Sequence, residues 1–312
     1  MKIAIMGTGG VGGYYGGLLA NQGHAVTFIA RGAHLQAIQA HGLQVKSIFG
    51  DFQVNPARAT DDPAQVGPVD LVLFLTKAYH TDQAAQAIKP LIEPETTVMS
   101  LQNGIDAVDR IGSVVGREHM LAGATWLSSA VEAPGVIKQV SQFRRVVLGE
   151  LTGQVTARAQ AVHKAFQDTG ITAELTENIL KVLWTKFVFI SAASSLGSLT
   201  RLPMGDYRAI PETRAMIASL MNEVKDVARA QAAALDEDVV QKSLDFMDNA
   251  APHIKASMQL DVEAGRRSEL ESMVGVIGRK GRESGVPTPV ADFVYASLLP
   301  IELKAQSNLI PA

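Results

Sequence analysis

A lysine in an apolar helical segment is the first residue of this sequence that could do chemistry. Lys186 lies in LWTKFVFISAAS, where its neighbours are mostly apolar. Burial removes water from an ammonium group and lowers its pKa toward values that suit proton donation. The alternative is a lysine whose stem packs on the helix while its ammonium group reaches water. The segment taken alone supports both interpretations.

Two further polar side chains, Lys77 and Asn103, follow apolar runs that predict buried strands. Lys77 comes directly after DLVLFLT, and Asn103 stands in LQNGID, after TVMSL. Ligands of parallel sheets collect at the carboxyl ends of the strands, so both side chains are candidates to contact a cofactor or substrate. The alternatives are an ordinary lysine at a strand end and an Asn-Gly turn.

Ser257 and Glu269 stand in the segment SMQLDVEAGRRSELE. A continuous helix from Met258 through Ser284 would place Ser257, Asp261 and, further along, Glu269 on one face. Such a face could bind a substrate, but a solvated charged face is the simpler interpretation.

A glycine-rich motif near the start of the chain predicts a dinucleotide site. Residues 7 to 12 fit the pattern G-x-G-x-x-G and are Gly7, Thr8, Gly9, Gly10, Val11 and Gly12. In this pattern the glycines permit a tight turn, close approach of a pyrophosphate and close packing of helix on strand. The predicted strand Lys2–Met6 precedes the motif, a predicted helix follows it, and a second predicted strand ends at Ala30. This context favours nucleotide binding over a purely structural glycine turn.

The residue after the second strand indicates which cofactor binds. Dehydrogenases that prefer NAD place an acidic residue there, to accept a hydrogen bond from the ribose 2′-hydroxyl. This chain has Arg31 instead, with no acidic residue near it in the sequence. A guanidinium group can pair with a 2′-phosphate at two points. We therefore expect NADP(H) rather than NAD(H), although a solvated surface arginine is the alternative.

The order of predicted elements indicates two domains. Up to about residue 175, short apolar runs alternate with helical patterns, which is typical of parallel strands joined by helices. Short alternating segments at Gly135–Gly149 predict antiparallel strands, and long helical patterns follow Asn178. The expected helices are Ile179–Ser195, Arg208–Ala233, Val239–Met247 and Met258 through Ser284. We predict an α/β Rossmann-type domain with a parallel sheet over 1–175 and an all-helical domain over 176–312, with a cleft between them.

Composition excludes several classes of protein. The 312 residues contain no cysteine, which excludes disulfides and thiolate metal sites, and we predict no metal site. A net charge of −3 lacks the basic footprint of a nucleic-acid binder. Glycines interrupt the uncharged stretch Ile3–Ala30, so we expect neither a signal peptide nor a membrane span, and a cytoplasmic protein. Helix faces rich in Met and Leu would suit either an internal core or a homodimer interface.

Taken together, these residues resemble the ketopantoate reductase (2-dehydropantoate 2-reductase) family over essentially the whole chain. The resemblance rests on GTGGVG, Arg31, TKAYHT with Lys77, QNG with Asn103, the helix of Lys186, and SMQLDVEAGRRSELE. It implies a Rossmann domain and a helical domain, with NADPH and substrate in the cleft. It also implies that Lys186 is the general acid, that Glu269 binds a substrate hydroxyl, and that Ser257 holds the substrate carboxylate. Asn103 would lie near nicotinamide and substrate, and Lys77 would position cofactor or substrate.

Two positions depart from the family pattern. Members that resemble the characterised reductases carry asparagines four and eight residues after the catalytic lysine, where this chain has Ile190 and Ser194. Both share a helical face with Lys186, so we expect them to line the same substrate pocket. Ile190 cannot donate a hydrogen bond, so this departure bears on the choice of substrate and not on the hydride chemistry.

The sequence therefore predicts an NADPH-dependent reductase of 2-dehydropantoate, a small 2-oxo acid. One alternative keeps the chemistry and changes the substrate to a more apolar 2-oxo acid. An alternative of another class is a non-catalytic NADP(H)-sensing protein on the same fold. The joint presence of Lys186, Ser257 and Glu269 favours an enzyme.

Overall fold

A computed structural model describes residues 1–307, which form two compact units. The sheet unit comprises Met1–Gln102 and Ala107–Ile179. The helical unit comprises Asn103–Asp106 and the described residues from Leu180 to Ser307. The chain passes from the sheet unit to the helical unit after Ile179, a few residues beyond the boundary expected from the sequence. No local pattern predicted that the short segment Asn103–Asp106 would join the helical unit.

Ten strands of the described residues form one sheet, in the order β4-β3-β9-β8-β7-β6-β1-β2-β5, with β10 beside β9. The strands are β1 (Lys2–Met6), β2 (Ala25–Ile29), β3 (Leu43–Ser47), β4 (Phe52–Val54), β5 (Arg58–Thr60), β6 (Leu71–Phe74), β7 (Thr97–Ser100), β8 (Met120–Ala133), β9 (Val136–Gly149) and β10 (Thr172–Leu175). The pairs β1–β2, β1–β6, β6–β7 and β7–β8 are parallel. The expected parallel α/β unit is confirmed.

The central strands are apolar because both faces of the sheet are covered. Every residue of β6 and of β7 is buried. The antiparallel pattern expected near Gly135 is also present, because β8 and β9 form a long antiparallel hairpin. The short strands β3, β4, β5 and β10 were not predicted, since three to five residues carry little periodic signal.

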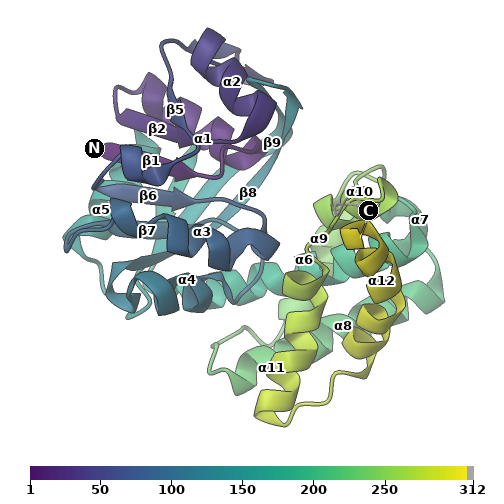
Figure 1. The fold of residues 1–312 in the computed structure, drawn as a ribbon. Coiled ribbons are helices and arrows are strands. Elements are labelled where there is room, and N and C mark those ends of the chain that lie inside the picture. Colours follow the sequence, from purple (N-terminus) through teal and green to yellow (C-terminus); the bar gives the residue numbers. More distant parts are fainter. Residues whose placement is uncertain (308–312) are drawn as a thin grey trace. The chain divides into compact units, whose positions relative to one another are not determined.

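Helices lie on both faces of this sheet (Figure 1). They are α1 (Gly10–Asn21), α2 (Gly32–His41), α3 (Thr81–Ala87), α4 (Ala107–Val115) and α5 (Ala157–Gln167). On one face, Tyr15 of α1 meets Phe166 of α5 edge to face, with ring centroids 5.6 Å apart. The helices α3 and α4 pack against each other, and Arg110 of α4 bonds to Asp82 of α3 at 3.0 Å.

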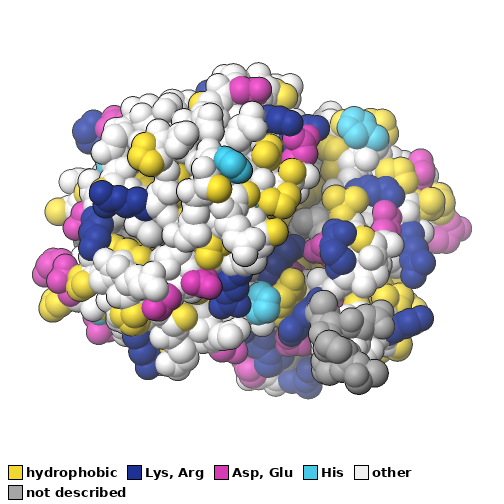
Figure 2. Space-filling model, turned by 45° about the horizontal axis from the view of Figure 1, so that its top comes forward, with side chains coloured by type: hydrophobic (Ala, Val, Ile, Leu, Met, Phe, Trp, Pro, Cys, Tyr) yellow, Lys and Arg dark blue, Asp and Glu magenta, His cyan; other side chains and the backbone are white. Residues whose placement is uncertain are grey.

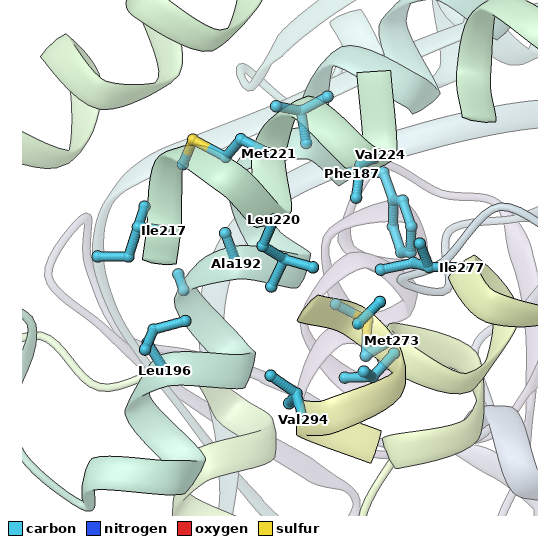
Figure 3. Packing of buried hydrophobic residues seen from close by; sticks show 14 of the residues in the cluster. Phe187, Ala192, Leu196, Ile217, Leu220, Met221, Val224, Met273, Ile277 and Val294 are labelled. Carbon is cyan, nitrogen blue, oxygen red and sulfur yellow. The ribbon is translucent and has the colours of Figure 1, made fainter. Parts of the chain in front are cut away.

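The helical unit has its own apolar core. Its helices are α6 (Ile179–Thr200), α7 (Met204–Arg208), α8 (Pro211–Ala230), α9 (Val239–Asn249), α10 (Ser257–Glu263), α11 (Val276–Ser284) and α12 (Pro289–Ser307), with a π-helical turn η5 (Glu271–Gly275). Phe187 of α6, Leu220 of α8 and Ile277 of α11 lie in one buried cluster (Figure 3). This cluster fixes the face of α6 that is turned inward.

Two long helices expected from the sequence have different bounds in the structure. The expected helix Arg208–Ala233 is present as α8, which begins at Pro211, because the residue before a proline disfavours helical backbone, and ends at Ala230. The expected helix from Met258 through Ser284 ends at Glu263, and Gly265 then has a φ of +64°. Glu269 therefore follows α10 in a non-helical segment, and the prediction that it shares one helical face with Ser257 is wrong.

Among residues 1–307, one helix, α6, is long and apolar enough to cross a membrane by length and composition alone. More than half of its most apolar window is buried inside the protein, as expected of a core helix. On the face drawn in Figure 2, basic and acidic side chains are interspersed, in keeping with the near-neutral net charge.

Candidate active site

The glycine motif forms the turn between β1 and α1, and close backbone contacts require two of its glycines. Gly7 has a φ of +101°, and a Cβ on it would lie 2.7 Å from the backbone nitrogen of Thr76. A Cβ on Gly12 would lie 2.2 Å from the carbonyl oxygen of Gly7. Side chains at these positions would push the helix away from the strand. These two glycines hold the turn in its shape.

Gly9 leaves the start of α1 open to a ligand, whereas Gly10 is required by close packing on β8, where a Cβ would lie 2.3 Å from the carbonyl oxygen of Ser129. A Cβ on Gly9 would meet no atom of the described chain within 4 Å. Gly9 is the N-cap of α1, whose first turn contains no acidic residue. The first amides of a helix lack intrahelical partners and favour anions. The open turn at Gly9, followed by the first amides of α1 at Gly10 and Val11, therefore fits the pyrophosphate of a dinucleotide.

Thr8 has a structural contact within the same loop. Its side chain is buried, and its hydroxyl and amide both donate to the carbonyl oxygen of Ile29, at 3.0 Å and 3.1 Å. Since Ile29 ends β2, these bonds tie the glycine loop to the strand that precedes Arg31.

Lys77 lies beside the glycine loop in the sheet unit. It follows β6, which pairs with β1 in parallel, and Thr76 directly before it contacts Gly7. The chain reverses its direction of travel across the sheet between β1 and β6, and ligands of such sheets bind at this switch point. The half-buried Lys77 is therefore placed where a cofactor would bind.

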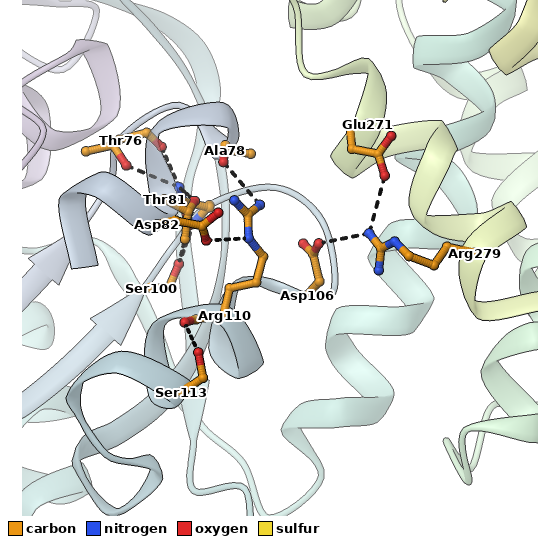
Figure 4. A network of polar contacts seen from close by, with 11 residues as sticks. Thr76, Ala78, Thr81, Asp82, Ser100, Asp106, Arg110, Ser113, Glu271 and Arg279 are labelled. Carbon is orange, nitrogen blue, oxygen red and sulfur yellow. Dashed lines mark hydrogen bonds and ion pairs between the residues drawn. The ribbon is translucent and has the colours of Figure 1, made fainter. Parts of the chain in front are cut away.

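Gln102 fixes this edge of the sheet and was not singled out from the sequence. Its side-chain amide nitrogen donates to the carbonyl oxygen of Thr76 at 2.7 Å and to the hydroxyl of Thr81 at 3.0 Å. Figure 4 shows these polar contacts between the ends of the strands and α3. Gln102 could have been identified from the sequence by its position directly before Asn103 in LQNGID.

Arg31 is exposed and forms the N-cap of α2, directly after the end of β2. In the structure, two acidic residues that are distant from Arg31 in the sequence lie at the same edge of the sheet. Ile29 and Thr60 are in register at the ends of β2 and β5, so Asp61 and Asp62 follow at the same edge. No acid is near Arg31 in the sequence, but the pairing of β5 with β2 brings these two acids to the same edge of the sheet. Asp62 accepts a hydrogen bond from the amide of Ala64 at 3.0 Å, while Asp61 is exposed.

In the helical unit, Lys186 is held by Asn103. The Nζ atom of Lys186 donates to the Oδ1 atom of Asn103 over 2.9 Å. Lys186 comes from the middle of α6, and Asn103 from the four-residue segment Asn103–Asp106. The structure thus brings together two predicted site residues that are 83 positions apart in the chain.

The environment of Lys186 changes its acidity. Desolvation lowers the pKa of Lys186 from 10.5 to about 8, and the negative charge of Glu269 opposes that change. Because the desolvation effect is the larger one, the pKa of the ammonium group stays below its usual value. Together, Lys186, Asn103 and Glu269 form a polar cluster that can donate a proton.

Glu269 is positioned by the residue before it. The carboxylate of Glu302 on α12 accepts hydrogen bonds from the backbone nitrogen and the hydroxyl of Ser268, at 2.9 Å and 2.7 Å. Both Ser268 and Glu269 are buried. The segment between α10 and η5 is therefore ordered, although it is not helical.

The other predicted substrate residues differ in their placement. Ile190 is partly buried against the helical core, and Ser194 is 2% exposed, one and two turns along α6 from Lys186. Ser257 is exposed as the first residue of α10, while Asp261 pairs with Arg266 at 2.8 Å. Asp261 is buried and paired with a cation, so the solvated charged face considered from the sequence does not describe it.

Comparisons with known proteins agree over nearly the whole chain. The family model described as "Ketopantoate reductase PanE/ApbA" matches residues 3–153, and its C-terminal counterpart matches residues 178–302. A 2-dehydropantoate 2-reductase of Nostoc sp. (strain PCC 7120) is 29% identical over 95% of this chain and 94% of its own.

Two solved structures extend the comparison. A PanE/ApbA family ketopantoate reductase from Ralstonia eutropha JMP134 is 34% identical, with a TM-score of 0.90 over 98% of this chain and 100% of its own. A D-mandelate dehydrogenase solved with NADH and anilino(oxo)acetate is 27% identical, with a TM-score of 0.89 over 100% of both chains. The similarity therefore extends to oxidoreductases that bear two different substrate names.

Proposed function

The chain belongs to the ketopantoate reductase family, and from that membership we propose that it reduces 2-dehydropantoate with NADPH, using Lys186 as the general acid. The observation that carries this proposal is the hydrogen bond of 2.9 Å from the Lys186 ammonium group to Asn103, in a setting that lowers the lysine pKa to about 8. General acids are most effective when their pKa lies near the working pH.

The proposed chemistry divides between the two units. When bound, NADPH would supply the hydride that adds to the ketone carbon. The open turn at Gly9 and the start of α1 would hold the pyrophosphate, and Lys77 would contact the cofactor or substrate beside it. Lys186 would give its proton to the carbonyl oxygen, which gains negative charge as the hydride arrives. The neutral amine that remains regains a proton from water.

Asn103 and Glu269 would orient the reacting groups. Asn103 accepts from Lys186 and so limits the directions in which the ammonium group points. Glu269 is a buried carboxylate that can accept a hydrogen bond from a substrate hydroxyl. Its charge also favours the protonated form of Lys186, which is the form that the reduction needs.

For the cofactor, we propose that Arg31 pairs with the 2′-phosphate of NADPH. Its place after β2 and its exposed guanidinium group support this choice. The related D-mandelate dehydrogenase was solved with NADH, so NADH is the competing cofactor against which this proposal must be tested. We also place the enzyme in the cytoplasm, with the apolar helix α6 as part of its core.

A second substrate class is favoured by Ile190. An isoleucine one turn from Lys186 offers an apolar surface where 2-dehydropantoate would present a hydroxyl group. The similarity to D-mandelate dehydrogenase supports the same direction. A more apolar 2-oxo acid, with a branched or aromatic side chain, is therefore the alternative substrate.

The test is a substrate screen that follows NADPH absorbance. 2-Dehydropantoate should give the highest kcat/KM among 2-oxo acids that include branched aliphatic and aromatic members. A higher kcat/KM for an apolar member would transfer the assignment to the alternative class. NADPH binding without consumption by any 2-oxo acid would contradict reductase activity altogether.

A further inference from the structure

We propose that Asp106 and Arg279 are positioning residues, and that their ion pair holds Asn103 where its Oδ1 atom accepts the hydrogen bond of Lys186. The inference rests on the proposed function, because it explains how the general acid is oriented. The first observation is topological. In the chain, Asn103–Asp106 stands between β7 and α4 of the sheet unit, yet the segment belongs to the helical unit.

The ion pair lies at the end of this segment. Nη2 of Arg279, on α11, is 3.4 Å from Oδ2 of Asp106 and 3.4 Å from Oε1 of Glu271 (Figure 4). The side chain of Asp106 is 10% exposed, and that of Arg279 is 42% exposed. A buried carboxylate that loses such a cation is strongly disfavoured, so the pair holds Asp106 in its place.

Two further contacts limit how the segment can move. Ile105 packs against the buried cluster of the helical unit. Gly104 has a φ of +105°, and a Cβ on it would lie 3.2 Å from the carbonyl oxygen of Ser272 in the π-helical turn. π-Helical turns are frequent at functional sites. The three residues that follow Asn103 are therefore all held in place. This limits the directions in which the side chain of Asn103 can point.

This orientation matters because the bond to Lys186 depends on which way the amide points. The Oδ1 atom of Asn103 can accept from an ammonium group, whereas the amide nitrogen on the other side can only donate. The charged group that acts on Lys186 is Glu269, and Asn103 adds a neutral acceptor. A hydrogen bond to a charged group is worth more than one between neutral groups, so its loss should reduce the stability of the ammonium form.

The test measures the acidity of Lys186 directly, by competitive acetylation of the whole enzyme across a pH series with mass-spectrometric readout. Asp106→Asn keeps the shape of the side chain and removes its charge. We expect this variant and Arg279→Met to lower the labelling pKa of Lys186 by about one pH unit. We expect kcat to fall about 10-fold, with an unchanged dissociation constant for NADPH. Arg279→Lys keeps the positive charge, so its labelling pKa and its kcat should both lie close to the wild-type values.

Glu271→Gln is the matched control, because it removes the other carboxylate on Arg279 and leaves Asp106 paired. The double variant Asp106→Asn/Arg279→Met should be no worse than either single variant, since both remove the same interaction. A labelling pKa that stays at the wild-type value, or that falls as far in Glu271→Gln, overturns the proposal. Labelling reports on Lys186 without turnover. A shift in an enzyme that reduces no 2-oxo acid would therefore contradict the proposed function and leave the positioning role standing.

Discussion

The ammonium group of Lys186 and the side-chain oxygen of Asn103 are 2.9 Å apart, one on a long apolar helix and the other on a four-residue segment that leaves the sheet unit. A lysine in such a helix is costly to keep charged, and one neutral acceptor compensates for only part of the lost hydration. The result is an ammonium group whose pKa lies near 8. This lowered pKa is what the proposed role of Lys186 as proton donor requires.

The lowered pKa of Lys186 has a consequence for stability. In the unfolded chain the lysine binds a proton up to about pH 10.5, and in the folded chain only up to about 8. Between these values the unfolded state binds more protons, so the stability of the wild type should rise with pH relative to that of Lys186→Met. We expect a relative gain of about 1–2 kcal/mol, reduced from the full value because the side chain is partly exposed.

The measurement is urea unfolding of both proteins from about pH 7 to about pH 10. Lys164→Met is the control, because the Lys164 side chain is 74% exposed and pairs with Asp168 on the surface. Parallel stability curves for wild type and Lys186→Met would show that the Lys186 ammonium group is not desolvated.

Arg31 should select the cofactor. Replacing it with alanine removes a guanidinium group that can pair with a 2′-phosphate at two points. We expect the KM for NADPH to rise about 10- to 100-fold while the KM for NADH changes little. Arg117→Ala, on a surface arginine before the start of β8, should alter neither. Steady-state kinetics with both cofactors gives the answer.

The acid beside Arg31 provides the opposing outcome. Asp61 follows β5 at the edge where β2 ends. In this outcome, Asp61→Asn weakens the binding of NADH more than Arg31→Ala weakens the binding of NADPH. The carboxylate of Asp61 then binds the ribose hydroxyl, and the enzyme prefers NAD(H).

Ile190 should set the preference among 2-oxo acids. Ile190→Asn places an amide one turn from Lys186, where it can bond to a substrate hydroxyl. We expect the ratio of kcat/KM for 2-dehydropantoate to that for a branched apolar 2-oxo acid to rise about 10-fold or more. Ile190→Leu keeps the volume and should leave the ratio near the wild-type value. An unchanged ratio in Ile190→Asn would place Ile190 outside the substrate pocket.

The sequence predicted the elements with a strong local signal. The strand Lys2–Met6 was predicted at its observed bounds, because its apolar run is buried on the sheet and ends at Gly7. Lys186 was a candidate because the sequence alone shows a charged residue among apolar neighbours in a predicted helix. Asn103 was a candidate from its strand end, but nothing local joined it to Lys186.

What the sequence could not predict depends on contacts between distant segments. The acids after β5 reach the edge of Arg31 only because β5 pairs with β2. The break after α10 comes from a glycine with positive φ and from the bonds of Ser268 to Glu302, 34 residues later. Helical periodicity continues through this region, so the local sequence pattern favoured one long helix. In the structure, a non-helical segment held by contacts to α12 stands there instead.

The most direct test of the general acid is the pH dependence of both directions of the reaction. Reduction of 2-dehydropantoate requires the ammonium form of Lys186, so kcat/KM should be level below about pH 8 and fall about 10-fold per pH unit above it. Oxidation of pantoate requires the neutral amine, so its rate should rise through the same pH and level off above it. Lys186→Met should lower both rates by about 100- to 10,000-fold and abolish both transitions. If the variant instead keeps the wild-type profile in either direction, Lys186 is not the proton donor.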